Sequence, residues 1–291
     1  MIVVKLQGGL GNQMFQYAFA KSVARFYKTR FLLDTDFLLD RDRNTNGKGA
    51  HFVFRDLDLT IFKAQLPLAK KNIEQDYLST KKSFREVLHL TNKKKHYGEY
   101  PFSFNKEVYI KNSSTYFFGY WQSEKYFAKI ATEIREDFTL KQPVLKSSLE
   151  LYNHIASKTA VCINFRRNDF LNNALGVTSM EYYQKAIDYI TNHITDPYFF
   201  VFSDDITWCQ QNFSIKKPFF IIDHSHKGDK FGNYFLLMQS CKHFIIPNSS
   251  FAWWAAWLCT YTGKIVIAPD VWFNHASHDT SDLIPEDWIR L

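Results

Sequence analysis

The stretch 2-IVVKLQGGLGNQMFQYAFAKSVARFY-27 decides the fold of the N-terminal half. Residues 2–6 are a short apolar run, typical of a buried strand, and a glycine-rich turn follows it. Apolar side chains then recur at helical spacing over residues 12–27. A strand, a glycine turn and a helix in this order predict the first unit of a parallel α/β sheet.

The second half of the chain alternates strands and helices more regularly. We expect strands at 159–165, 198–203, 219–222, 243–246 and 264–268, with helices at 179–192, 232–241 and 250–259. Strands that alternate with helices predict a doubly wound parallel sheet. Pro143 and Ser147-Ser148 interrupt the pattern, so we expect one domain over residues 1–145 and a second over residues 146–291.

The sequence between these two regions is less regular. Residues 31–34 and 115–119 are expected to be strands, and residues 123–138 a single amphipathic helix capped by Ser123. From about 37 to 110 the sequence is basic and aromatic without a clear period. This composition indicates short helices and loops inserted into the first domain.

Composition and charge limit the class of protein. The chain has 291 residues, of which 46% are hydrophobic and 22% charged, and these values exclude a disordered or fibrous protein. Aromatic residues make up 18%, and such side chains line many ligand clefts, including sugar sites. The net charge is +7, and most of the excess lies in residues 63–95. This basic stretch is either a solvated face or a surface for anionic lipids or substrates.

Cysteine spacing and hydropathy bear on the compartment. Cys162, Cys209, Cys241 and Cys259 lie far apart without C-x-x-C spacing, so we expect neither a zinc nor a redox motif. Apolar runs around three of them predict buried free thiols and a reducing compartment. The most apolar stretch, 244–259, is interrupted by proline and polar residues, and the N-terminus does not resemble a signal peptide. We expect a cytoplasmic protein, which the basic stretch would place at the inner face of the membrane unless that stretch is only a solvated face.

Polar residues follow four of the expected strands. In chain order they are Gly8, Gly9, Gly11, Asn12 and Gln13; Arg166, Arg167 and Asp169; Asp204 and Asp205; and Asn248, Ser249 and Ser250. Parallel strands share one carboxyl edge, where the ligands of open α/β sheets bind. We therefore expect all four segments to line one cleft.

The first two segments each have a functional and a structural interpretation. The glycine turn lacks the dinucleotide fingerprint and the P-loop sequence. It either lets a substrate approach the backbone and the helix N-terminus or is a plain tight turn. Arg166 and Arg167 either bind phosphate through their forked guanidinium groups, with Asp169 holding one of them, or form a structural ion pair.

The other two segments have similar alternatives. An expected helix begins at the segment Asn248, Ser249 and Ser250. This segment either caps the helix or presents backbone N–H groups and hydroxyls to a phosphate. Asp204 and Asp205 hydrogen-bond a ribose or a guanine, or they cap a helix. Together the segments predict a nucleotide-diphosphate site in which arginine takes the place of a metal ion.

Metal binding is not expected elsewhere in the sequence. Three D-x-D pairs resemble those that bind Mn²⁺ in metal-dependent glycosyltransferases: Asp34/Asp36, Asp40/Asp42 and Asp56/Asp58. Their repetition in one aspartate-rich stretch indicates charged turn residues instead. The histidines lack the spacing of a zinc site.

Five segments together resemble one known family. They read GGLGNQMFQYAFA at 8–20, GYWQSEKYF at 119–127, NFRRND at 164–169, NSSFAWWAAWL at 248–258 and IPEDWI at 284–289. In this order they resemble glycosyltransferase family 11, the bacterial and animal α-1,2-fucosyltransferases. The resemblance runs from end to end and implies a GT-B-like fold, in which two Rossmann-like domains turn their parallel sheets toward a central cleft.

The resemblance also implies an activity, that of a galactoside 2-α-L-fucosyltransferase. Such an enzyme moves L-fucose from GDP-β-L-fucose, with inversion, to the 2-hydroxyl of a β-galactoside. The implied partners are GDP-fucose and a galactose-terminated oligosaccharide or glycolipid. No metal, other cofactor or nucleic acid is implied.

Site roles carry over only where residues match the family pattern. Arg166, Arg167 and Asp169 match the family loop H-x-R-R-x-D, whereas Asn164 replaces its histidine, which helps to contact the nucleotide in related fucosyltransferases. By resemblance Arg166 would hold the β-phosphate. The other implied roles are guanine contact by Asp204 or Asp205, pyrophosphate contact by Ser249 and Ser250, and lining of the fucose or acceptor side by Gly8 to Gln13. A base for the acceptor hydroxyl is not obvious, with Asp169 and Asp36 as candidates.

Three hypotheses follow. The first is the inverting fucosyltransferase. The second is a GT-B transferase that uses another nucleotide sugar, which the replacement at Asn164 suggests. The third is a non-catalytic binder of carbohydrate or anionic polymer, which would use the basic stretch and the aromatic residues.

Overall fold

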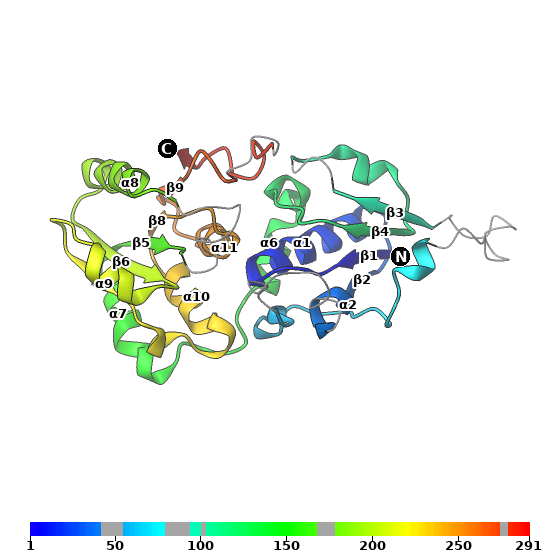
Figure 1. Cartoon of the computed structure of the whole chain (residues 1–291), viewed down its shortest axis with the longest axis horizontal. Helices are drawn as coiled ribbons and strands as arrows, with labels where there is room; N and C mark the ends of the chain where they lie inside the picture. Colours follow the sequence, from blue (N-terminus) through cyan, green and yellow to red (C-terminus); the bar gives the residue numbers. More distant parts are fainter. Residues whose placement is uncertain (42–54, 79–93, 100–102, 168–177, 274–278) are drawn as a thin grey trace, which may run out of the picture. The chain divides into compact units, whose positions relative to one another are not determined.

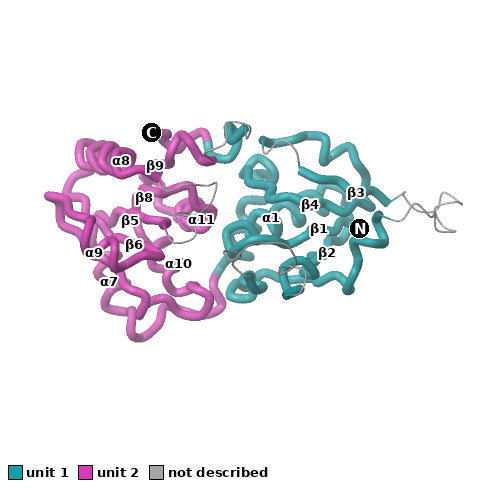
Figure 2. The backbone as a smooth tube through the Cα atoms, in the orientation of Figure 1, with its two compact units in different colours: residues 1–139, 278–285 teal, residues 140–277, 286–291 magenta. Residues whose placement is uncertain are grey.

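The computed structural model describes residues 1–41, 55–78, 94–99, 103–167, 178–273 and 279–291. The chain divides into two compact units, and Figure 2 shows them in different colours. Unit 1 comprises residues 1–139 and 278–285, and unit 2 comprises residues 140–277 and 286–291. The main division thus falls after Thr139, shortly before the expected boundary at 145, and a segment near the C-terminus joins unit 1.

Unit 1 is built on a four-stranded, all-parallel sheet with the order β2-β1-β4-β3 (Figure 1). Its strands are β1 (Ile2–Lys5), β2 (Phe31–Asp34), β3 (Lys95–Gly98) and β4 (Thr115–Phe118). The apolar runs predicted three of them. Strand β3 lies in the stretch expected to be irregular, and no residue of it is fully buried, so it carries no apolar pattern for a sequence to show.

Helix α1 (Leu10–Phe26) is the main helix of unit 1. It is buried along most of its length, including its polar Gln13 and Gln16, because it packs on β1 and β2 and contacts the turn at Glu124–Tyr126. Four further helices in the described part of unit 1 are short: α2 (Asp36–Leu39), η1 (Asp58–Ile61), α4 (Gln75–Leu78) and η2 (Lys106–Ile110).

The prediction of a single helix over residues 123–138 is wrong. The structure instead has two 3-10 turns, η3 (Glu124–Tyr126) and η4 (Ala128–Ile130), followed by α6 (Ala131–Asp137). Phe127 and Ile130 each have a φ of −124°, outside the helical range. Burial explains the break, because Tyr126, Phe127 and Ile130 are all directed into the core.

Unit 2 is built on a six-stranded, all-parallel sheet with the order β10-β9-β8-β5-β6-β7. Its strands are β5 (Thr159–Phe165), β6 (Pro197–Ser203), β7 (Phe219–Ile221), β8 (His243–Ile245), β9 (Val266–Ala268) and β10 (Ile289–Arg290). The first five match the expected strands. Two parallel sheets confirm the predicted α/β class.

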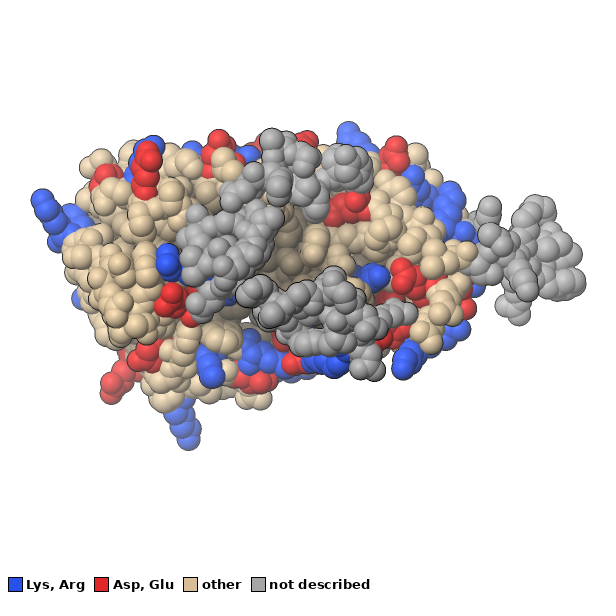
Figure 3. All heavy atoms as spheres, viewed as in Figure 1, with Lys and Arg blue, Asp and Glu red and all other residues tan. Residues whose placement is uncertain are grey.

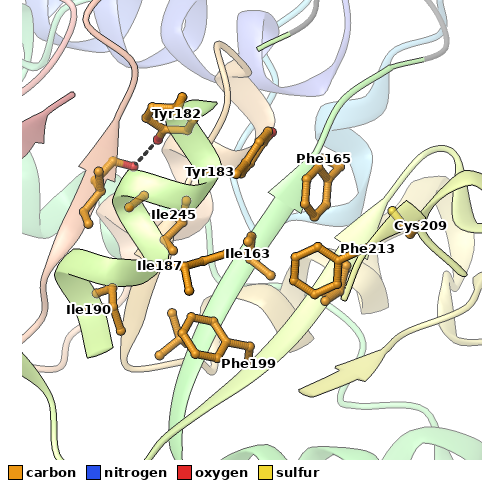
Figure 4. Close-up of a cluster of buried hydrophobic side chains, with 14 residues drawn as sticks. Ile163, Phe165, Tyr182, Tyr183, Ile187, Ile190, Phe199, Cys209, Phe213 and Ile245 are labelled. Atoms are coloured by element: carbon orange, nitrogen blue, oxygen red, sulfur yellow. Dashed lines mark hydrogen bonds between the residues drawn. The ribbon is translucent and has the colours of Figure 1, made fainter. Parts of the chain in front are cut away.

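Helices alternate with the strands of unit 2, as predicted. They are α7 (Leu149–Ser157), α8 (Met180–His193), α9 (Ile206–Asn212), α10 (Gly232–Gln239) and α11 (Ser250–Leu258), with 3-10 turns η5 (Lys146–Ser148), η6 (His224–His226) and η7 (Asp229–Phe231). Figure 4 shows α8 against β5, with Tyr183 and Ile187 facing Ile163 and Phe165. The Tyr182 hydroxyl donates to the carbonyl oxygens of Ile246 and Ile267, which satisfies a phenol inside the core. All four cysteines are buried free thiols, as predicted.

Candidate functional site

The carboxyl edge of the unit 2 sheet gathers three of the four predicted segments. Strands β8, β5 and β6 are neighbours in the sheet and run parallel. The segments after them are therefore adjacent: Asn248–Ser250 follows β8, Arg166–Arg167 follows β5, and Asp204–Asp205 follows β6. This is the edge at which open α/β sheets bind ligands.

Each arginine at this edge faces an aspartate from the neighbouring strand. Arg166 Nε lies 3.2 Å from Asp204 Oδ2, and Arg167 Nε lies 3.5 Å from Asp205 Oδ2. The Arg167 backbone N–H also donates to Asp204 Oδ1 at 2.9 Å. The aspartates thus fix the arginines in place, a task that the sequence assigned to Asp169, which lies outside the described residues.

Arg167 is held more firmly than Arg166. Its guanidinium stacks on the Trp208 ring at 3.8 Å, and its side chain is 18% exposed, against 29% for Arg166. Asp205 accepts from the Trp208 N–H at 3.0 Å and so caps α9. Asp205 therefore caps α9 in addition to pairing with Arg167, whereas Asp204 contacts both arginines.

Asn164 occupies the place of the family histidine and is buried in β5. Its side-chain Nδ2 donates to the Phe202 backbone carbonyl at 3.1 Å. The backbone carbonyl of Asn164 accepts from the Tyr183 hydroxyl at 2.8 Å. The side chain thus ties β5 to β6 directly behind the arginine pair. An amide can make this contact without becoming charged.

The segment Asn248–Ser250 leads into α11. Asn248 is buried between two neighbours: its Nδ2 donates to the Trp272 carbonyl at 3.1 Å, and its Oδ1 accepts from the Thr178 hydroxyl at 3.2 Å. Ser249 stands at the N-cap position of α11, but its side chain makes no capping hydrogen bond. Simple capping therefore does not account for Ser249.

The turn after β7, at the same edge, was missed by the sequence reasoning. Its backbone is left-handed at Gly228 (φ 64°), Lys230 (φ 46°) and Phe231 (φ 60°), and two of these residues are not glycine. His224 Nε2 lies 2.8 Å from the Ser203 carbonyl, and the Phe231 ring packs edge-on against His224. Left-handed non-glycine residues are concentrated at functional sites. The carboxyl-edge rule that found the other segments would have found this one.

The glycine segment in unit 1 forms the turn between β1 and α1. Gly8 has a φ of +79°, and a Cβ there would lie 2.4 Å from Asn12 Nδ2, so the position requires glycine. Gly9 is the N-cap of α1, and Gly11 lies buried in its first turn. Gly8 therefore forms a tight turn at the start of α1.

Two amides at this turn hold other parts of unit 1. Gln13 Nε2 donates to the carbonyls of Gly8 and Asp56, and Gln13 Oε1 accepts from the Asp58 N–H. Gln13 thus anchors the segment that leads into η1. Asn12 Oδ1 accepts from Gln122 Nε2 at 2.8 Å, which joins α1 to the residues after β4.

The first D-x-D pair, Asp34 and Asp36, accepts hydrogen bonds from other residues of unit 1. Asp34 is buried and accepts from the Tyr116 hydroxyl at 2.7 Å and the Asp36 N–H at 2.9 Å, and burial raises its pKa. Asp36 accepts from the Asn72 N–H, and Asp56 pairs with Arg41. Within the described part of the chain, no group of three or more His, Cys, Asp or Glu side chains could hold a metal ion.

Three lysines in the described part of the basic stretch contact other residues of unit 1. Lys70 pairs with Asp76 at 2.8 Å, Lys94 Nζ lies 5.6 Å from the centre of the Tyr77 ring, and Lys95 Nζ donates to the Lys111 carbonyl at 2.9 Å. On the face drawn in Figure 3, basic and acidic side chains are interspersed. Lys81, Lys82, Arg85 and Lys93 lie outside the described residues. Over the parts that the structure covers, no helix is long and apolar enough to cross a membrane.

The sequence matches glycosyl transferase family 11 over residues 1–291. The chain belongs to this family. An α-1,2-colitosyltransferase from Escherichia coli is 33% identical to this family 11 protein, and the alignment covers 100% of this chain and 99% of the relative. The O-antigen biosynthesis glycosyltransferase WbnK, also from Escherichia coli, is 32% identical, and the alignment covers 98% of this chain and 99% of the relative. Galactoside α-(1,2)-fucosyltransferase 1 from Rattus norvegicus is 26% identical over 60% of this chain and 50% of the relative.

Solved structures confirm the fold of this family 11 chain. Arabidopsis thaliana FUT1 in complex with GDP superposes with a TM-score of 0.52 over 92% of this chain and 70% of that one, at 13% identity. The α-1,6-fucosyltransferase NodZ soaked with GDP-fucose superposes with a TM-score of 0.50 over 94% of this chain and 96% of NodZ, at 14% identity. The predicted GT-B-like fold class is therefore confirmed.

Proposed function

We propose that this family 11 glycosyltransferase moves L-fucose from GDP-β-L-fucose, with inversion, to the 2-hydroxyl of a β-galactoside. The observation that carries the proposal is the pair of arginines at the carboxyl end of β5, each fixed by an aspartate that follows β6. A fixed, forked guanidinium suits a diphosphate leaving group. The names of the α-1,2-transferring relatives support the linkage.

The two arginines would have different tasks. Arg166 is the more accessible, and its guanidinium would bind the β-phosphate and stabilise the charge that develops as GDP departs. Arg167 is stacked on Trp208 and would mainly keep the loop in shape. The N–H groups at the start of α11 and the Ser249 hydroxyl, which makes no capping hydrogen bond, would complete the phosphate site.

The acceptor would be a galactose-terminated oligosaccharide or glycolipid. The N-terminal glycine turn, with Asn12 and its partner Gln122, offers neutral amides and backbone groups, which suit sugar hydroxyls. Asp204 would accept from the guanine or the ribose in addition to holding the arginines. No metal ion is needed in this scheme, because the cations are supplied by the chain.

A second candidate donor is a nucleotide-activated colitose. It is favoured by the 33% identity to an α-1,2-colitosyltransferase over the whole chain and by Asn164 in place of the family histidine. The reaction class would be the same, and only the sugar that the site accepts would differ.

The deciding experiment offers both activated sugars to the purified protein with a panel of galactosides, and NMR determines the linkage. Transfer of fucose to the 2-hydroxyl supports the first proposal, and a strong preference for colitose supports the second. Donor hydrolysis and GDP binding are measured in parallel. A protein that neither binds GDP nor consumes a nucleotide sugar would be a binder, as in the third hypothesis.

A further inference from the structure

The amino edge of the unit 1 sheet lies opposite to the carboxyl edge described above. The four strands run parallel, so all of them begin at this edge, and α1 ends there because it leads from the end of β1 to the start of β2. Exposed basic residues lie along it: Lys28 after α1, Arg30 before β2, and Lys94 and Lys95 at the start of β3. The edge is thus basic from β2 on one side of the sheet to β3 on the other.

The short helix η2, which precedes β4, extends this edge. Within η2 the Tyr109 ring lies edge-on to the Phe26 ring at the end of α1, with centroids 4.8 Å apart. Just after η2, the Lys111 carbonyl accepts from Lys95 Nζ at 2.9 Å, which joins η2 to the start of β3. The end of α1, η2 and the start of β3 therefore form one continuous surface.

Two large apolar side chains are exposed on this surface. Phe26 is 57% exposed and Ile110 is 76% exposed. They are neighbours, because Ile110 directly follows Tyr109, against which Phe26 packs. A single exposed apolar residue needs no explanation, whereas apolar residues gathered within a polar rim mark an interaction surface.

The charge of this surface is positive. Two of its basic residues are balanced by acidic ones: Lys111 pairs with Glu107 at 3.0 Å, and Arg25 pairs with Glu133 at 2.8 Å. Three further basic side chains are exposed and form no ion pair within the described part of the chain: Lys28, Arg30 and Lys106. The exposed apolar pair is therefore surrounded by an excess of positive charge.

Basic groups around exposed apolar side chains suit the surface of an anionic bilayer. Lipid phosphates attract the basic groups, and the boundary between headgroups and acyl chains takes up the apolar ones. A nucleic acid would attract the same basic groups through its phosphates but would offer no apolar layer to Phe26 and Ile110. The combination therefore favours lipid as the partner.

We propose that the amino edge of unit 1 binds the surface of an anionic lipid bilayer. Phe26 and Ile110 insert at the level of the headgroups, while Lys28, Arg30 and Lys106 lie beside the lipid phosphates. The carboxyl edge of unit 1 is at the other end of the same strands, so this contact does not cover it. The inference concerns where the enzyme works and does not depend on which sugar it transfers.

The first test detects insertion of Ile110. In an Ile110→Cys variant of the full chain, an environment-sensitive fluorophore is attached to the new thiol, because all four native cysteines are buried. Its emission should shift to the blue on vesicles of phosphatidylcholine with about one third phosphatidylglycerol, and not on phosphatidylcholine alone. Val271→Cys is the control, since Val271 is 64% exposed and belongs to unit 2, and its label should not shift.

The second test removes three charges from the edge and measures binding to the same vesicles by sedimentation. The combined variant is Lys28→Gln, Arg30→Gln and Lys106→Gln. It should weaken binding about 10²-fold at low salt, or about fivefold for each charge. A matched control removes the same charge from exposed sites of unit 2 and should weaken binding less than about threefold. It combines Lys146→Gln, Lys216→Gln and Lys217→Gln. Melting temperatures establish that both variants fold.

Three results would overturn the inference: a wild type that does not bind anionic vesicles, equal weakening by the two triple variants, or an unshifted label at position 110. Binding of single-stranded DNA as tight as binding of the vesicles, with the label unshifted, would assign the edge to nucleic acid instead. Transfer to a soluble galactoside is measured separately, so a failure of the proposed function is distinguishable from a failure of membrane binding.

Discussion

The two sheets of this protein have the same parallel construction and different polar groups at their carboxyl edges. In unit 2 the edge has two arginines paired with two aspartates. In unit 1 it has the amides of Asn12, Gln16 and Gln122 together with carboxylates, Glu99 after β3 and Asp34 and Asp36 at the end of β2. The charged edge of unit 2 has groups that suit a diphosphate, and the amide-rich edge of unit 1 has groups that suit hydroxyls, so one topology presents two different sets of polar groups.

Arg166→Lys is the change that most directly breaks the charged edge. A lysine keeps the charge but cannot form the two-pronged contact to a phosphate, so we expect kcat/KM to fall by about 10²–10³-fold. Steady-state kinetics with GDP-fucose measures this, alongside the melting temperature. Near-normal turnover in the folded variant would remove Arg166 from its role.

Arg167→Lys is the matched control for Arg166→Lys. It removes the stack on Trp208, so we expect a loss of about 1 kcal/mol in the free energy of unfolding. Its kcat/KM should fall less than that of Arg166→Lys. A larger loss of turnover at Arg167 would reverse the assignment of the two arginines.

Gly8→Ala breaks the amide-rich edge of unit 1 through its backbone. The left-handed φ of +79° and the contact with Asn12 make an alanine strained there, so we expect a loss of about 1–3 kcal/mol in the free energy of unfolding. Gly9→Ala is the control, because its φ is −78° and the nearest atom to its Cβ would be 3.7 Å away. Denaturant melts of both variants test this, and equal losses would contradict the turn geometry.

Replacing Lys93, Lys94 and Lys95 by Gln tests a surface outside both edges. Each lysine near an anionic leaflet contributes about 1 kcal/mol, but Lys94 and Lys95 already make internal contacts, so we expect binding to anionic vesicles to weaken about tenfold. Wild-type binding should also fade with salt. Turnover on a small galactoside should not change. If the wild type does not bind anionic vesicles, the basic stretch is only a solvated face. If the folded triple variant loses turnover on the small galactoside, the lysines belong to the acceptor site.

EDTA should have the smallest effect. If the arginines and the start of α11 provide the positive potential, fucose transfer should change less than about twofold when divalent ions are removed. The assay is run with and without EDTA, and then with added Mn²⁺. A loss of more than tenfold that Mn²⁺ restores would show that the charged edge is not sufficient.

Local sequence pattern determined much of this protein. Apolar runs and helical periods located eight of the ten strands and the long helices α1, α8 and α11, because burial of one face is encoded within a few residues. The carboxyl-edge rule then selected Arg166, Arg167, Asp204, Asp205 and Ser249. Five ordered motifs identified the family, which the match over the whole chain confirms.

Tertiary structure decided which of these residues meet. Arg166 finds Asp204 only because β5 and β6 are neighbours, and Glu99 finds Tyr120 and Trp121 only because β3 pairs with β4. Strand order is set by packing between distant segments, and a half-exposed strand such as β3 leaves no period in the sequence. The pKa of Glu99 likewise depends on burial and on N–H groups contributed by another segment, so no local pattern could have revealed it.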